Sequence, residues 1–127
     1  MNKRIAVAIE EHPGNKELVA EHFGRCTKIV VVEVNPQNEI IKNEVYSNPL
    51  ADSGHGTCQL PGYINQFSVS AVIAGGMGGK AVANFEAFGI EVVTAPGMIA
   101  KEALQLFTEG KLAGYEACAG HEGEHNC

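Results

Sequence analysis

A histidine, an arginine and a cysteine lie within five residues of one predicted loop, as His22, Arg25 and Cys26. Imidazole nitrogen and thiolate sulfur bind borderline and soft metals, and a guanidinium could pair with an anionic cluster or lower the thiol pKa. The alternative is that Phe23 and Cys26 pack inward while His22 and Arg25 are solvated. Spacing alone favours this alternative.

A second group of metal-binding side chains lies near the C-terminus, and its members are Cys118, His121, His125 and Cys127. Two sulfurs and two ring nitrogens are the donor set of a tetrahedral site for zinc, or for another divalent metal. The spacing differs from that of a zinc finger, whose ligand pairs stand a dozen residues or so apart. A disordered end, or a disulfide between Cys118 and Cys127, remains an alternative.

A glycine-rich loop, formed by Gly75, Gly76, Met77, Gly78 and Gly79, separates a predicted strand from a predicted helix. Backbone N–H groups at such a position can bind an anion. The loop does not fit the P-loop pattern, and the acidic residue of a dinucleotide fingerprint is missing. Close packing of the strand against the helix is the structural alternative to ligand binding.

The sequence offers little support for catalysis. The two central apolar strands, 5–9 and 71–74, contain no carboxylates, which argues strongly against a two-metal nuclease. Neither a G-x-S-x-G elbow nor a C-x-x-C motif occurs. A thiol-dependent enzyme, with Cys26 or Cys58 activated by His22 or His55, stays open as an alternative. We predict a binding protein rather than an enzyme.

Apolar patterning predicts one α/β arrangement around these loops. The second half reads as strand, helix, strand, helix, which favours a parallel sheet with right-handed crossovers. Pro61 is expected in the first turn of its helix. The expected strands are 5–9, 27–34, 39–46, 71–74 and 90–94, the second and third forming an antiparallel hairpin, and the expected helices carry Leu60, Ile64 and Phe67, then Val82 and Phe85, then residues 99–107.

Composition limits the class of protein. A length of 127 residues fits one domain, which we place at residues 1–115, followed by a flexible Cys/His-rich tail at 116–127. The formal net charge is -6, and the nine Lys and Arg residues are scattered, which argues against a nucleic-acid partner. No signal-peptide pattern and no long apolar run occur, so we expect a cytoplasmic protein without a membrane partner. We also expect a monomer.

The sequence resembles the dinitrogenase iron-molybdenum cofactor biosynthesis family of NifX-like and NafY-like proteins in several short motifs that occur in the same order. Each motif alone is unspecific, but the ordered series is specific and spans roughly residues 3–114. The motifs are the strand 5–9, the His-Phe-Gly-Arg run 22–25, Asn48 with Pro49, the run 72–78, the run 85–93, the Ala-Pro-Gly run 95–97, and the run 102–104.

The resemblance implies a ribonuclease H-like, three-layer α/β fold whose mixed five-stranded sheet has one antiparallel strand, the second. It also implies prokaryotic origin and binding of an iron-sulfur or molybdenum/iron-sulfur cluster, with cluster donor or acceptor proteins as partners. His22 is then a candidate cluster ligand, beside Arg25, Cys26 and the loop formed by Gly75, Gly76, Met77 and Gly78. The alternative is an interaction module that responds to metal or redox state through the tail.

Overall fold

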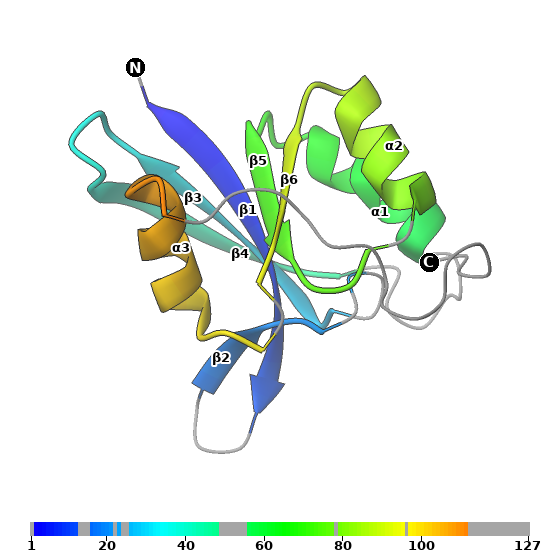
Figure 1. The fold of residues 1–127 in the computed structure, drawn as a ribbon, viewed down its shortest axis with the longest axis horizontal. Coiled ribbons are helices and arrows are strands. Elements are labelled where there is room, and N and C mark those ends of the chain that lie inside the picture. The colour runs from blue at the N-terminus through cyan, green and yellow to red at the C-terminus, as the bar shows by residue number, and fades with distance from the viewer. Residues whose placement is uncertain are drawn as a thin grey trace.

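The computed structural model describes residues 2–12, 16–21, 23, 26–48, 56–77, 79–95 and 97–111. In these residues six strands form a single sheet, and three helices pack against it (Figure 1). The elements are β1 (Lys3–His12), β2 (Lys16–Val19), β3 (Lys28–Val34), β4 (Ile40–Ser47), α1 (Gly56–Asn65), β5 (Ala71–Ala74), α2 (Gly79–Ala87), β6 (Glu91–Thr94) and α3 (Ala100–Thr108).

The sheet is mixed, with strand order β4-β3-β1-β5-β6. Strand β3 runs antiparallel to both of its neighbours, whereas β1, β5 and β6 are parallel to one another. The predicted hairpin and the parallel second half are therefore confirmed. In this path of five strands β3 is the one antiparallel strand, as expected.

A sixth strand, β2, was not predicted. It pairs with the end of β1, where Glu10, Glu11 and His12 lie opposite Leu18, Glu17 and Lys16. The strand expected at residues 5–9 is therefore longer than predicted, because it continues through Glu10, Glu11 and His12. The polar residues continue the strand because their backbone groups find partners in β2, which has only four residues and no pattern of its own.

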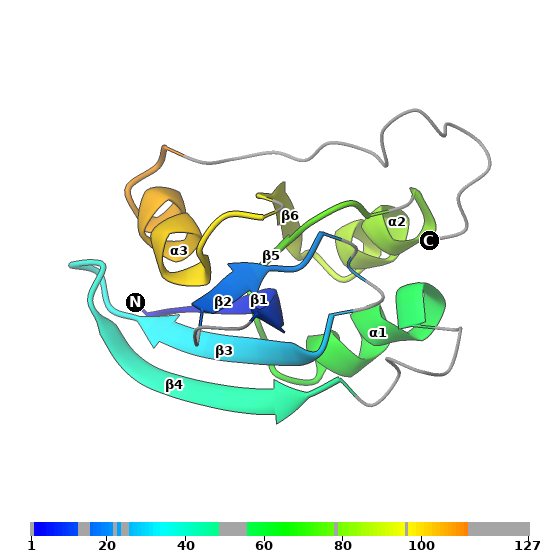
Figure 2. The ribbon, with the colours of Figure 1, turned by 90° about the horizontal axis from the view of Figure 1, so that it is seen from below.

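Helices cover both faces of the sheet. Seen from below, α1 and α2 lie on one side of the strands and α3 on the other, which gives three layers (Figure 2). Strands β1, β3 and β5 are buried on both faces, so alternate residues contribute to two apolar clusters. One cluster contains Phe85 of α2 and Leu60 of α1, and the other contains Leu104 of α3.

Two predictions about α1 were wrong. Pro61 lies inside α1, beyond its first turn, although it cannot donate the helical hydrogen bond. Its side chain is buried, so packing offsets that loss. Phe67 lies after the end of α1 rather than on its apolar face, and it stacks on Tyr46 of β4 with ring centroids 4.3 Å apart.

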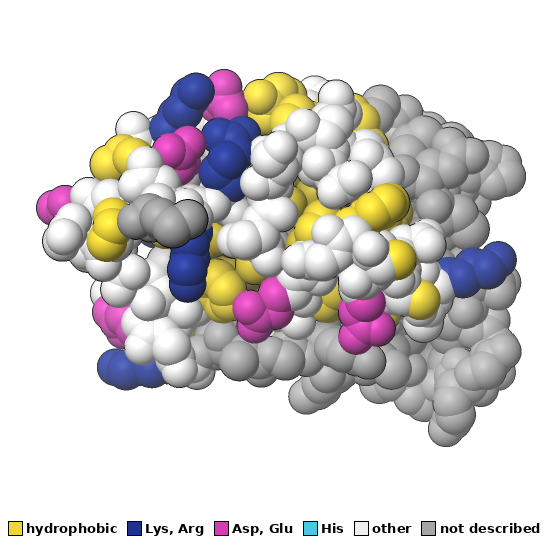
Figure 3. Space-filling model, turned by 90° about the horizontal axis from the view of Figure 1, so that it is seen from above, with side chains coloured by type: hydrophobic (Ala, Val, Ile, Leu, Met, Phe, Trp, Pro, Cys, Tyr) yellow, Lys and Arg dark blue, Asp and Glu magenta, His cyan; other side chains and the backbone are white. Residues whose placement is uncertain are grey.

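The surface of the described residues carries charges of both signs. On the face seen from above, Lys and Arg side chains are interspersed with Asp and Glu (Figure 3). Such a face lacks the continuous basic patch that a nucleic-acid backbone requires. None of the described helices is long and apolar enough to cross a membrane.

Candidate functional site

Three connecting segments meet where the parallel strands end. One leads from β2 toward β3, the second follows β5, and the third follows β6, and all lie in the lower part of Figure 1. The N–H of Val19 donates to the carbonyl of Met98 at 2.8 Å, and the N–H of Ala95 donates to the carbonyl of Ala74 at 2.9 Å. The carboxyl ends of parallel strands are the usual location of ligand sites in α/β folds.

The segment that contains His22 is joined to the glycine-rich loop by its backbone. The N–H of Phe23 donates to the carbonyl of Gly76 at 3.1 Å, and the N–H of Gly76 donates to the carbonyl of Glu21 at 2.6 Å. His22 itself lies outside the described residues, but both of its neighbours in the chain are fixed to Gly76. The two motifs singled out in the sequence are thus brought together, although more than fifty residues separate them.

Gly75 makes this contact possible. A Cβ atom at Gly75 would overlap the backbone carbonyl oxygen of Ala20, so no larger residue fits without moving the chain. The N–H of Gly76 is used in the bond to Glu21, and the side chain of Met77 is fully buried in the core. In the described part of this loop, close packing between segments therefore accounts for the glycine and for the apolar residue.

Cys26 points into the core. It is fully buried, as is Phe23, whose ring meets Phe85 of α2 edge to face at 5.4 Å. The inward packing of Phe23 and Cys26, the alternative favoured by spacing, is confirmed. Arg25, like His22 and Gly78, lies outside the described residues.

A buried amide holds Cys26 in place. The Nδ2 group of Asn48, just after β4, donates to the carbonyl oxygen of Cys26 at 2.8 Å and to its Sγ at 3.5 Å. Burial raises the pKa of the Cys26 thiol to about 12, although the bond from Asn48 lowers it in part. The thiol is therefore protonated at neutral pH. A raised pKa disfavours the thiolate that an activated nucleophile at Cys26 would need.

No local pattern in the sequence indicates a role for Asn48, which with Pro49 is only one motif of the family resemblance. A buried polar side chain must find a hydrogen-bond partner, and Asn48 is the polar residue that the structure buries among the described ones. Its partner is 22 residues away in the chain, so a local pattern could not reveal it.

The remaining predicted residues are not brought together in the described part of the chain. Cys118, His121, His125 and Cys127 lie beyond residue 111, and His55 also falls outside the described ranges. Cys58 lies in α1, and its side chain is not described. Among the described residues, no three His, Cys, Asp or Glu side chains form a group that could hold a metal ion.

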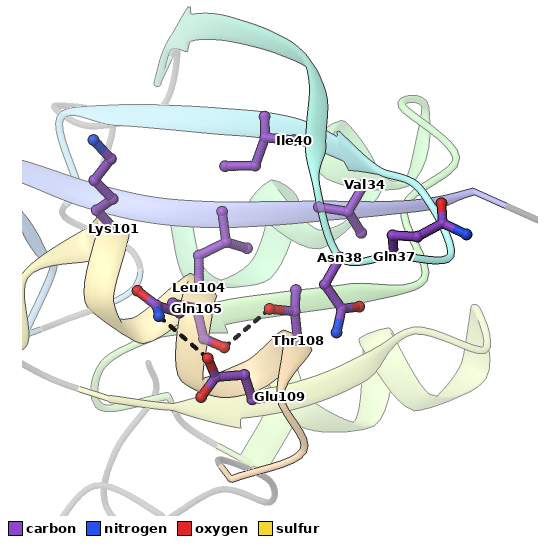
Figure 4. A pocket seen from close by; sticks show the side chains of 9 residues that line it. All are labelled: Val34, Gln37, Asn38, Ile40, Lys101, Leu104, Gln105, Thr108 and Glu109. Atoms are coloured by element: carbon purple, nitrogen blue, oxygen red, sulfur yellow. Dashed lines mark hydrogen bonds between the residues drawn. The ribbon is translucent and has the colours of Figure 1, made fainter.

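A pocket lies at the other end of the sheet. It has a volume of about 480 Å³ and is enclosed by α3 and by the turn between β3 and β4 (Figure 4). Val34, Ile40 and Leu104 provide apolar lining, and Lys101 and Glu109 lie at its border. Because Val34 pairs with Lys3 at the start of β1, this pocket is remote from the loops around Gly76.

The fold and the joined loops define a mixed α/β protein whose candidate site lies at the carboxyl edge of its parallel strands. The chain belongs to the family described as dinitrogenase iron-molybdenum cofactor, whose profile matches residues 1–110. The resemblance inferred from the motifs is thereby confirmed.

Individual proteins are similar to this chain in sequence or in structure. The uncharacterized protein MJ0580 of Methanocaldococcus jannaschii is 33% identical over 105 residues, which cover 82% of this chain and 88% of that protein. The crystal structure of PH0822 superposes with a TM-score of 0.72 at 30% identity, covering 86% of this chain and 93% of the other. The apo form of the orange protein from Desulfovibrio gigas gives a TM-score of 0.71 at 27% identity, covering 87% and 90% of the two chains.

Proposed function

We propose that this protein binds an iron-sulfur or molybdenum/iron-sulfur cluster and passes it between a donor and an acceptor protein, without catalysing a reaction. Family membership supports the type of cargo, because the family is described by the iron-molybdenum cofactor. The main support for placing the binding site at these loops is the pair of backbone hydrogen bonds that join Gly76 to Glu21 and Phe23. This pairing fixes both neighbours of His22 beside the glycine-rich loop.

We assign different roles to the residues of the segment between β2 and β3. Cys26 is fully buried and is held by the Asn48 amide, so we assign it to anchoring the loop. We assign ligation to His22 and charge pairing with an anionic cluster to Arg25. The start of α2 at Gly79 follows the loop directly, and a helix N-terminus favours negative charge nearby.

Reconstitution under anaerobic conditions tests the proposal. The full chain, purified anaerobically, is incubated with iron and sulfide, with and without molybdate, and is then desalted. We expect visible absorption to remain with the protein and elemental analysis to find iron and sulfide bound. A full chain that retains no metal or sulfide after desalting would overturn the proposal.

Variants locate the site. His22→Ala should lose most of the bound cluster, whereas His12→Ala, a matched change in β1, should retain it. Circular dichroism and thermal melting show whether each variant is folded. If His22→Ala retains the cluster as well as the unaltered chain does, the assignment of His22 is wrong.

Shortening the chain separates the core from the tail. A chain that ends at Tyr115 lacks Cys118, His121, His125 and Cys127, the candidate ligands of the tail. We expect it to retain the cluster, because the joined loops lie before residue 80. Complete loss of metal on this truncation would instead favour the metal- or redox-responsive tail.

A further inference from the structure

Strand β4 forms a long, uncovered edge of the sheet. It has eight residues, it pairs on one side with β3, and no described helix or strand lies beyond its other side (Figure 2). Three apolar side chains on it are about half exposed, with Ile40 at 47%, Ile41 at 53% and Val45 at 53%. Exposed edges in monomeric proteins are usually short or protected, because their free N–H and C=O groups can pair with another strand.

The sequence of β4 is complementary to itself in one antiparallel register. Residues directly opposite one another in an antiparallel ladder have their side chains on the same face of the sheet, whereas neighbours along a strand have theirs on opposite faces. In a symmetric pair of β4 strands, one residue must therefore lie opposite its own copy, and the two-fold axis passes between these two copies. With Asn43 on the axis, Lys42 lies opposite Glu44 of the partner subunit, and the symmetry repeats this pair. A shift of one residue puts Lys42 or Glu44 opposite its own copy, and like charges in that position destabilise a sheet.

The same register pairs apolar residues. It puts Val45 opposite Ile41 of the partner subunit, and the symmetry repeats this pair. Each subunit thus covers part of two side chains that are half exposed in the single chain. The ladder ends there, because the pairing of β4 with β3 has a bulge beside Ile41. A ladder this short is typical of a weak, concentration-dependent interface.

The charges on β4 remain available for a partner. Within one chain the Nζ of Lys42 lies 4.0 Å from an Oε of Glu44, the outer limit of an ion pair, and both side chains are more than a third exposed. The Nη2 of Arg4 lies 3.8 Å from the other Oε of Glu44. A surface pair at 4.0 Å contributes little stability, so the more exposed Lys42 can exchange it for a carboxylate of a second chain.

In place of the monomer expected from the sequence, we propose that this chain forms a two-fold symmetric dimer in which β4 pairs antiparallel with β4 of a second copy, centred on Asn43. The two sheets then become one continuous sheet. Asn48, which contacts the candidate cluster site, lies five residues from the axis, so the two copies of it stand roughly 34 Å apart along the paired strands. The dimer leaves both sites open, and its test is independent of cluster binding.

Charge reversal gives a sharp test. Sedimentation equilibrium over a concentration series measures the dimer dissociation constant of the full chain with reducing agent. Lys42→Glu puts a second carboxylate opposite Glu44 in both symmetric pairs and should weaken the dimer about ten-fold. The double variant Lys42→Glu with Glu44→Lys should restore the original affinity, and Lys80→Glu, on exposed α2, should leave it unchanged.

Cross-linking tests the register. In a chain whose Cys58, Cys118 and Cys127 are replaced by Ser, Asn43→Cys should form a disulfide-linked dimer on mild oxidation, because residue 43 faces its own copy across the axis. Lys80→Cys in the same background should not. A chain that stays monomeric at the highest soluble concentration, or a double variant as weak as Lys42→Glu, would overturn the proposal.

Discussion

Removing the Asn48 amide tests how the loop of the candidate site is held. In Asn48→Ala the carbonyl of Cys26 loses the donor that lies 2.8 Å away, and it stays in a buried position. A buried group left without its hydrogen bond costs about 1–3 kcal/mol, so we expect the free energy of unfolding to fall by about 2 kcal/mol. For a chain of this length that corresponds to a decrease in Tm of about 6–10 °C.

Urea denaturation followed by circular dichroism measures this change. Asn65→Ala, an exposed asparagine at the end of α1, is the matched control and should change stability by less than about 0.5 kcal/mol. Asn48→Asp replaces the donor by an acceptor that faces the same carbonyl, and at neutral pH it should be at least as destabilising as Asn48→Ala. If Asn48→Ala and Asn65→Ala unfold at the same urea concentration, Asn48 does not hold the loop and our reasoning is refuted.

Three further predictions concern the same region and its core. Gly75→Ala forces its Cβ against the Ala20 carbonyl and should lower stability by about 1–3 kcal/mol in urea denaturation, whereas Gly62→Ala, in α1 with open space around it, should raise stability by about 0.5–1 kcal/mol. Equal effects would contradict the close approach. The stability contributed by the protonated Cys26 thiol should be present below about pH 9 and lost as the pH rises toward 12. The unaltered chain should therefore lose more stability than Cys26→Ala over that range. Parallel curves of unfolding free energy against pH for the two chains would contradict this. Phe85→Ala removes the ring that contacts Phe23 and should cost about 3–5 kcal/mol by thermal or urea unfolding, while a cost under about 1 kcal/mol would show that the loop does not depend on this contact.

Local patterns in the sequence predicted most elements because their causes are local. The strand at residues 71–74 is a continuous apolar run, and the structure buries all four residues. The helix that carries Ala103 and Leu104 has its apolar residues at helical spacing, and both are buried against the sheet. The hairpin of β3 and β4 followed from two extended runs joined by a short polar turn.

The sequence by itself also determined the family, since an ordered series of motifs can be read from the residues without knowing which of them are in contact. What it could not determine depends on partners distant in the chain. Strand β2 exists because β1 offers it backbone partners, Pro61 is accepted because its surroundings bury it, and Gly75 is needed because the Ala20 carbonyl lies against it.

The protonation of Cys26 shows most clearly which properties depend on the tertiary structure. Its position beside His22 and Arg25 in the sequence suggests a reactive thiol or a ligand. The tertiary structure removes it from water and places the Asn48 amide against it, so that the neutral thiol is favoured. A thiol pKa depends on the dielectric and the hydrogen bonds around the sulfur, and only the folded chain supplies these.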